Sequence, residues 1–260
     1  MHIRKILAIS LLLATTLHAG AADLLDTVKQ RGTLRVAMEG TYPPFNYKEN
    51  GQLAGFEVEL SNALAQKLGV KADFTTGEWS ALLAGLQAGK YDVVINQVGI
   101  TDKRKETFDF SEPYTISSPQ LIVRQDEKRD FKTLADLRGK KLGLGQGTNF
   151  ADMAKAVGGI DIKTYPGSTE YLQDLALGRI DAAMNDSLLI PYIIKKTKLP
   201  LKAGAPVGEI EKNGIPFAKN NPKFKAALDK ALADMEADGS FAKISNKWFD
   251  RDVSKPPVAK

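Results

Sequence analysis

The chain has 260 residues, a net charge of +5 and no cysteine, and its two histidines, His2 and His18, both lie in the first 21 residues. The rest of the chain therefore has no disulfide, no Ser-His-Asp or Cys-His catalytic set and no ordinary zinc site. The mild, scattered charge argues against nucleic acid as a partner. Enzymes that use carboxylates, lysine or tyrosine stay open, but the composition favours a binding protein, and we expect no cofactor and no metal.

The first 21 residues predict a secretory signal peptide. Arg4 and Lys5 precede a 12-residue apolar run, and Ala19-Gly20-Ala21 supplies an A-x-A-type cleavage site. A membrane anchor would need about 20 apolar residues, so this run is too short to be one. We expect cleavage before Ala22 and a mature protein in the periplasm.

Beyond the signal peptide, short apolar strands alternate with amphipathic helices. Strands are predicted at 33–38, 71–76, 91–96, 121–125, 140–145, 161–166 and 180–185. Helices are predicted at 56–69, 79–89, 131–138, from about 149, at 169–178, at 187–196 and over 222–249. Such alternation is typical of parallel α/β units.

Residues 96–104, NQVGITDKR, place an arginine at an unusual position. The strand stops at Asn96, Gly99 follows, and a helix is predicted to open at Thr101 with Arg104 in its first turn. A cation there is disfavoured by the helix dipole, which makes the same place attractive to an anion. Arg104 is therefore either a solvated residue of the charged run DKRKE or one arm of an anion site.

One internal repeat organises the chain. Residues 86–97 read LQAGKYDVVINQ and residues 175–186 read LALGRIDAAMND, with five positions matched at an offset of 89. Each segment is a helix end, a tight turn and a buried strand that ends in polar residues. Chance is one explanation, since this connection is common; the other is two similar α/β lobes whose strand ends face one cleft.

Seven motifs in register resemble the periplasmic amino-acid-binding proteins of ABC importers. They are EGTYPPFNY, GFEVEL, YDVVIN, ITDKRKETFDFSEPY, GQGTN, GRIDAAMND and DGSFAKISNKWF, and they span essentially the whole mature chain. Among these, EGTYPPF, together with VVINQV and DFSEPYTIS, is most similar to the cystine-binding branch.

The resemblance implies an α/β, two-lobed periplasmic-binding-protein fold of type II, with two hinge strands and a ligand cleft between the lobes. Residues 22–115 plus 212–260 would form the first lobe and residues 116–211 the second. The hinge crossings would lie at 115–119 and 207–214.

The implied function is an extracytoplasmic receptor, expected to be a monomer, that captures a polar L-amino acid and delivers it to a membrane ABC permease. Cystine is the expected ligand, and a basic or other polar amino acid is the alternative. A second alternative is a periplasmic cyclohexadienyl-dehydratase-like enzyme on the same scaffold. That enzyme would need an acid with a raised pKa, for which Glu39 and Glu78 are the candidates.

The family positions assign the amino-acid head group. Arg104 would bind the α-carboxylate through its planar guanidinium, assisted by the backbone of Gly99. The segment GLGQGTN resembles a dinucleotide fingerprint with a misplaced third glycine. It is better interpreted as an anion nest in which Gly147 and Thr148 meet the carboxylate from the other lobe. Asp186 would accept the α-ammonium, or else cap the helix that follows it.

The remaining candidates surround the ligand side chain. Tyr42 and Trp79 would form aromatic walls, with core packing as the alternative for each. Asn96 and Gln97 stand where the family usually has small hydroxyl residues, and their amides would bind polar ligand atoms. Glu39 would face a distal ammonium, as cystine and the basic amino acids have.

Overall fold

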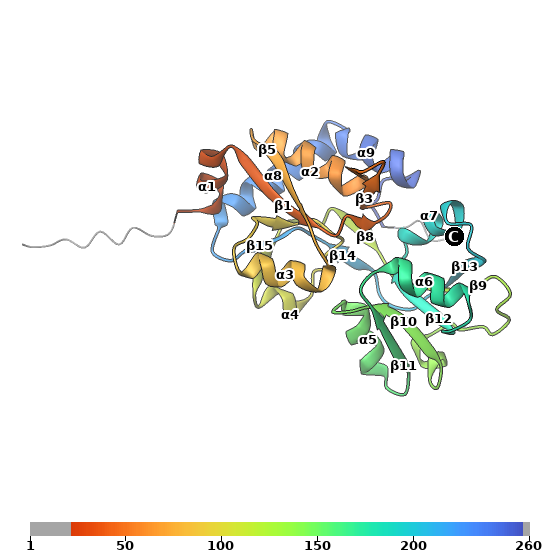
Figure 1. The fold of residues 1–260 in the computed structure, drawn as a ribbon. Coiled ribbons are helices and arrows are strands. Elements are labelled where there is room, and N and C mark those ends of the chain that lie inside the picture. Colours follow the sequence, from red (N-terminus) through yellow and green to blue (C-terminus); the bar gives the residue numbers. More distant parts are fainter. Residues whose placement is uncertain (1–21, 257–260) are drawn as a thin grey trace, which may run out of the picture.

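The computed structural model describes residues 22–256, so the predicted signal peptide at residues 1–21 lies outside the described part. Two five-stranded sheets, each covered by helices, make two lobes, and a two-stranded ribbon runs between them (Figure 1). We call the lobe around the N-terminal sheet the first lobe and the other the second lobe.

The first sheet has the strand order β5-β1-β6-β15-β7. Its strands are β1 (Thr33–Met38), β5 (Lys71–Thr76), β6 (Val93–Val94), β7 (Phe108–Phe110) and β15 (Pro216–Ala218). The helices are α1 (Leu24–Arg31), α2 (Phe56–Lys67), α3 (Trp79–Gln87), α4 (Asp102–Lys105), α8 (Pro222–Ala237) and α9 (Ser240–Phe249). A small meander of β2 (Thr41–Tyr42), β3 (Asn46–Glu49) and β4 (Gln52–Ala54) completes this lobe.

The second sheet has the strand order β11-β10-β12-β9-β13. Its strands are β9 (Pro119–Arg124), β10 (Lys141–Gly145), β11 (Asp161–Tyr165), β12 (Ala182–Asp186) and β13 (Leu201–Pro206). Its helices are α5 (Asn149–Val157), α6 (Ser168–Ala176) and α7 (Leu189–Lys196), with a 3₁₀ turn η1 (Leu134–Leu137).

The ribbon between the lobes pairs β8 (Thr115–Ser117) with β14 (Glu211–Asn213) in antiparallel register. Strand β8 leads into β9, and β14 leads into β15. Each of these two following strands runs antiparallel to both of its neighbours, whereas the pairs β1–β5, β1–β6, β10–β11 and β10–β12 are parallel. The sheets are therefore mixed, because the strand that enters each lobe from the ribbon is inserted against the direction of the α/β units.

Two predicted elements are shorter than expected. The strand predicted at 91–96 is reduced to Val93–Val94, although the amides of Asp92 and Ile95 still bond β1. Beyond Ile95 the Glu39 amide donates to the side-chain oxygen of Asn96 at 2.8 Å instead of to a backbone carbonyl. The helix predicted at 131–138 is the 3₁₀ turn η1, closed by a capping box between Thr133 and Asp136.

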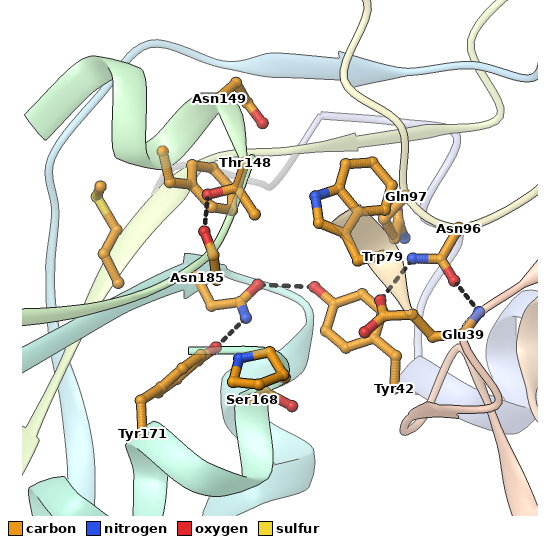
Figure 2. Close-up of a pocket in the computed structure, with 15 residues that line it drawn as sticks. Glu39, Tyr42, Trp79, Asn96, Gln97, Thr148, Asn149, Ser168, Tyr171 and Asn185 are labelled. Carbon is orange, nitrogen blue, oxygen red and sulfur yellow. Dashed lines mark hydrogen bonds between the residues drawn. The ribbon is translucent and has the colours of Figure 1, made fainter. Parts of the chain in front are cut away.

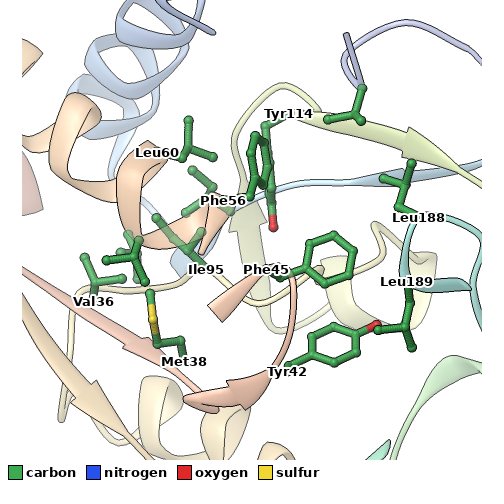
Figure 3. Packing of buried hydrophobic residues seen from close by; sticks show 14 of the residues in the cluster. Val36, Met38, Tyr42, Phe45, Phe56, Leu60, Ile95, Tyr114, Leu188 and Leu189 are labelled. Carbon is green, nitrogen blue, oxygen red and sulfur yellow. The ribbon is translucent and has the colours of Figure 1, made fainter. Parts of the chain in front are cut away.

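Apolar packing continues from the first lobe into the second. Val36, Met38 and Leu60 are buried between β1 and α2, and the same cluster includes Leu188 and Leu189 at the start of α7. In Figure 3, Phe45 and Tyr42 lie between these two groups. One side of the interface between the lobes is therefore apolar, which leaves the polar side for a ligand.

Candidate functional site

A cavity that is partly open to solvent lies between the lobes. Both lobes contribute to its wall. From the first lobe come Glu39, Tyr42, Trp79, Asn96 and Gln97, and from the second Gly145, Thr148, Asn149, Phe150, Pro166, Gly167, Ser168, Tyr171, Met184 and Asn185.

Glu39 and Asn96 form a fixed pair on the wall of the first lobe (Figure 2). Asn96 Oδ1 accepts hydrogen bonds from the Glu39 amide at 2.8 Å and from Asn46 Nδ2 at 2.9 Å, and Asn96 Nδ2 donates to Glu39 Oε2 at 2.8 Å. Both acceptor sites of the Asn96 oxygen are thus used within the protein. Glu39 keeps one carboxylate oxygen without a protein donor among the described residues, so it can accept from a ligand.

Gln97 offers a donor on the same wall. Its backbone has φ 47°, an uncommon value for a residue other than glycine. The side-chain oxygen accepts the Thr115 hydroxyl at 2.6 Å, and Nε2 is buried without a hydrogen-bond partner among the described residues. An unpaired buried donor costs free energy, and a ligand acceptor would remove that cost.

Tyr42, Asn185 and Tyr171 join the two walls. Tyr42 Oη donates to Asn185 Oδ1 at 2.7 Å, and Asn185 Nδ2 donates to Tyr171 Oη. Figure 2 shows these bonds side by side across the cavity. Since Tyr42 follows β1 and Asn185 belongs to β12, the chain of bonds connects the lobes directly.

Thr148 and Gly147 lie at the start of α5. Thr148 is the N-cap of this helix: its hydroxyl donates to the Gly145 carbonyl at 2.9 Å and accepts the Ala151 amide at 3.3 Å. It lines the cavity, as does its neighbour Asn149, whereas Gly147, with φ 74°, is not among the lining residues. The glycine supplies the left-handed turn that brings Thr148 to the cleft.

Arg104 and Gly99 lie behind Trp79 instead of on the cavity wall. Arg104 Nη1 donates to the Gly99 carbonyl at 2.9 Å, and the guanidinium lies 5.4 Å from the centre of the Trp79 ring. Helix α4 is a single turn of four residues, so the expected conflict between Arg104 and a helix dipole does not arise. Gly99 instead lines a neighbouring hollow, together with Asn149 and Glu211.

Asp186 is buried beneath the cavity and bonded to the ribbon. Ser117 Oγ donates to its Oδ2 at 2.5 Å, the Leu188 amide donates to Oδ1 at 2.8 Å, and Asn213 Nδ2 lies 3.5 Å from Oδ2. Asp186 is therefore held by both ribbon strands, and it is not among the described residues that line the cavity.

Burial raises the pKa values of several acids around the cleft. The pKa of Glu39 rises to about 7, opposed by the Asn96 hydrogen bond, and that of Asp186 to about 6, opposed by Ser117. The pKa of Glu211 also rises to about 7, first through burial and then through the charge of Asp186. Burial lowers the pKa of Arg104. The site is thus rich in acceptors that a positively charged group would stabilise.

Of the ten predicted site residues, six line the cavity: Glu39, Tyr42, Trp79, Asn96, Gln97 and Thr148. Sequence reasoning missed Tyr171 and Ser168 of α6 and left Asn185 out of the site. The repeat contained the signal for Asn185, since it matches Asn96. Nothing in the pattern of α6 distinguished Tyr171 from an ordinary core aromatic, and it is 1% exposed. Glu78, the second candidate acid, is exposed and outside the cavity wall.

Known proteins resemble this chain in sequence and in fold. The L-cystine-binding protein TcyJ of Escherichia coli (strain K12) is 41% identical over 96% of this chain and 95% of its own length. An ancestral arginine-binding protein bound to arginine superposes with a TM-score of 0.80 at 37% identity, covering 84% of this chain and 99% of that one.

A second solved structure is the ancestral amino acid-binding protein AncCDT-1, described as a precursor of cyclohexadienyl dehydratase. It has a TM-score of 0.81 at 33% identity, over 88% of this chain and all of that one. No helix within residues 22–256 is long and apolar enough to cross a membrane. The profile of the bacterial extracellular solute-binding proteins, family 3, matches residues 34–251, and the chain belongs to that family.

Proposed function

We propose that this protein is a receptor for a polar L-amino acid, with cystine as its ligand, and that it delivers the ligand to an ABC transporter permease. The observation that carries the proposal is the cavity between the lobes, on one wall of which lie Glu39, with one free carboxylate oxygen, and Gln97, with an unpartnered, buried Nε2. A cystine-binding relative at 41% identity supports the choice of ligand.

The head group next to the ribbon is assigned to five residues. Arg104 binds the α-carboxylate together with Gly99 and the α5 start at Gly147 and Thr148, while Asp186 accepts the α-ammonium. Arg104 and Asp186 lie just outside the cavity wall, so binding requires the guanidinium to turn from the Gly99 carbonyl and Asp186 to accept one more donor. A carboxylate has about four acceptor sites, and three donors point at Asp186.

The distal head group of cystine is assigned to the wall of the first lobe. Its ammonium pairs with Glu39, and its carboxylate accepts from Gln97 Nε2. Asn96 serves mainly to hold Glu39, since its oxygen and one N–H are already used. Tyr42 and Trp79 enclose the apolar middle of the ligand; they are 9% and 8% exposed.

Competition calorimetry against all proteinogenic amino acids and cystine tests the proposal. Leucine and valine should bind at least about tenfold more weakly than cystine, because each buried polar group left unpaired costs about 1–3 kcal/mol. Arginine, lysine or glutamine binding more than about tenfold tighter than cystine would refute the ligand but keep the receptor. Failure of every amino acid to bind would refute both.

One observation favours a second candidate, a dehydratase-like enzyme. The pKa of Glu39 is raised to about 7 by burial, the range that a general acid at neutral pH needs, and AncCDT-1 is described as an enzyme precursor. We favour the receptor, because one Glu39 oxygen is already bound by Asn96. Mass spectrometry of the tightest ligand after incubation with the protein decides: conversion that Glu39→Gln abolishes would establish the enzyme.

The lobe limits, the cellular location and the oligomeric state are also proposed. Residues 22–115 plus 212–260 form one lobe and residues 116–211 the other; the sheet memberships and the β8–β14 ribbon support these limits. Residues 1–21 are removed on export to the periplasm, where the protein acts as a monomer. Intact-mass analysis of the periplasmic fraction and size-exclusion chromatography with light scattering test these points.

A further inference from the structure

Glu57, in the first turn of α2, is a fully buried carboxylate. No lysine or arginine within residues 22–256 lies within ion-pair distance of it. It accepts three hydrogen bonds instead, from Asn46 Nδ2 at 2.6 Å, Tyr114 Oη at 2.5 Å and the Gln97 amide at 2.7 Å. Burying a carboxylate without a cation costs free energy, and the three hydrogen bonds offset part of that cost. The burial of Glu57 therefore points to a role beyond packing.

One arm from Glu57 reaches Gln97. Glu57 Oε1 accepts the amide of Gln97, whose backbone is left-handed with φ 47°. Thr115 of the ribbon holds the oxygen of the Gln97 side chain at 2.6 Å. With the backbone and Oε1 both fixed, the unpartnered Nε2 of this cavity-lining residue also has a fixed position. A left-handed non-glycine residue persists only where its surroundings hold it, and Glu57 is one of the groups that do so.

The other arm from Glu57 reaches Glu39. Asn46 Nδ2 donates to Glu57 Oε2 and to Asn96 Oδ1 at 2.9 Å, and Asn96 Nδ2 donates to Glu39 Oε2. The two amides have only one consistent orientation, because Asn46 Oδ1 accepts the Gly40 amide at 2.7 Å and Asn96 Oδ1 accepts the Glu39 amide. The end of this arm, from Asn96 to Glu39, is visible in Figure 2.

We propose that Glu57 is a positioning residue for ligand specificity: without touching the ligand, it holds the Glu39 carboxylate and the Gln97 amide in place for the distal head group. This inference rests on the proposed function, because the two groups would bind the far ammonium and carboxylate of cystine. The near head group is assigned to Arg104 and Asp186, which are less closely coupled to Glu57. The Arg104 guanidinium bonds the Gly99 carbonyl, and Asp186 is reached from Gln97 only through Thr115 and Asn213, by the 3.5 Å contact of Asn213 Nδ2. Binding of this head group should therefore depend less on Glu57.

A purely structural role for Glu57 makes a different prediction. If Glu57 only anchored the start of α2, its loss would weaken all ligands equally along with the fold. The two roles therefore differ in the ratio of affinities for a ligand with two head groups and a ligand with one. S-methylcysteine is a suitable second probe, because it keeps the near head group and the first sulfur of cystine and lacks the distal head group.

The decisive variants are Glu57→Gln and Tyr114→Phe. The first puts an NH₂ group among the three donors. The second removes one donor from the carboxylate and one of the two acceptors of the Gln97 amide, at 3.0 Å, while keeping the ring that stacks on Phe56, 6.3 Å between centres. Ser61→Ala is the control: Ser61 is buried on the same helix, and its hydroxyl bonds only the Glu57 carbonyl, at 2.6 Å.

Calorimetry with cystine and with S-methylcysteine is the measurement, with thermal unfolding run in parallel. Glu57→Gln should weaken cystine binding about tenfold or more while S-methylcysteine changes less than about threefold, and Tyr114→Phe should shift the ratio the same way by a smaller factor. Ser61→Ala should lower stability and leave the ratio unchanged. If Glu57→Gln does not fold, Tyr114→Phe decides alone.

An equal loss for both ligands, or no loss of cystine affinity, would overturn the positioning role. Failure of the wild-type protein to bind either probe would refute the proposed ligand instead, which keeps the two conclusions separate. Should the wild type prefer arginine, arginine and alanine replace the two probes, because arginine also carries a distal cation.

Discussion

Tyr42→Phe tests whether the bond between the lobes contributes to ligand capture. The substitution removes the hydroxyl that donates to Asn185 Oδ1 at 2.7 Å and keeps the ring that stacks on Phe45 at 4.9 Å. Asn185 Oδ1 keeps a second donor, the Asp186 amide at 2.6 Å, so the oxygen is not left unpaired. The loss should therefore equal the usual net contribution of a hydrogen bond, about 1 kcal/mol.

That free energy acts on the closed arrangement of the lobes and not on either lobe alone. The affinity for every amino acid should fall by about fivefold, since 1.4 kcal/mol corresponds to tenfold, and the dissociation rate should carry most of the change. Stopped-flow fluorescence and calorimetry measure both quantities.

Tyr165→Phe is the matched control for this prediction. It removes a hydroxyl that donates to Asp174 at 2.8 Å, and both residues belong to the second lobe. It should lower the unfolding temperature and leave affinity unchanged. Unchanged affinity in Tyr42→Phe, or an equal effect of the two variants on affinity, would show that the bond does not stabilise the closed arrangement.

Three further outcomes are expected. Arg104→Ala should fold and bind all amino acids more weakly by about 2–5 kcal/mol, because a buried carboxylate loses its partner; near-native affinity by calorimetry would remove it from the site. Glu39→Gln should weaken cystine and arginine by about tenfold or more while alanine is little changed, and equal losses would contradict its distal role. The unfolding temperature of the ligand-free protein should fall from pH 5 to pH 8, as followed by calorimetric scans. The pKa values of Glu39, Glu57 and Glu211 are raised to about 7 and that of Asp186 to about 6, so the folded state holds extra protons that it loses over this range. Carboxyls with lowered pKa values, such as Glu127 and Asp174, change the stability only below pH 5. An unfolding temperature that rises from pH 5 to pH 8 would contradict the raised pKa values of the four buried acids.

Much of the fold could be predicted from hydrophobic periodicity. The strand at 33–38 has the expected limits. The helix predicted at 56–69 begins at Phe56 as expected and ends at Lys67, shortly before Gly69, whose φ is 74°. Local patterns could not show the direction of β9 and β15, because an antiparallel strand has the same apolar run as a parallel one. The direction is set by the ribbon, a contact between segments about 100 residues apart in sequence.

The site could be predicted where polar residues follow the end of a strand, or where an aromatic residue precedes a proline. Asn96, Gln97 and Tyr42 line the cavity for these reasons. The part of the cavity wall that α6 contributes could not be predicted, because Tyr171 has the same helical spacing as a core residue. Nor could the sequence show that the side-chain oxygen of Asn96 accepts hydrogen bonds from Glu39 and Asn46. These partners lie 57 and 50 residues away in sequence, and only the packing of the chain brings them together.

The two halves of the repeat share their backbone arrangement and differ in what their last residues contact. In both halves, an aspartate makes equivalent hydrogen bonds to the neighbouring strand. The Asp92 carboxylate accepts the Arg35 amide at 2.8 Å, and the Asp181 carboxylate accepts the Lys141 amide at 2.9 Å. Each aspartate also donates its own amide to the carbonyl of that same residue. The equivalence ends four residues later.

Asn96 and Asn185 occupy matching strand ends, yet Asn96 turns inward to Glu39 in its own lobe, whereas Asn185 accepts the Tyr42 hydroxyl from the other lobe. A common α/β unit thus places one asparagine to orient a charged group and the other to join the lobes. The aspartate before the strand maintains the scaffold, whereas the asparagine at or just beyond the strand end is free to take another role, because only this end faces the cleft.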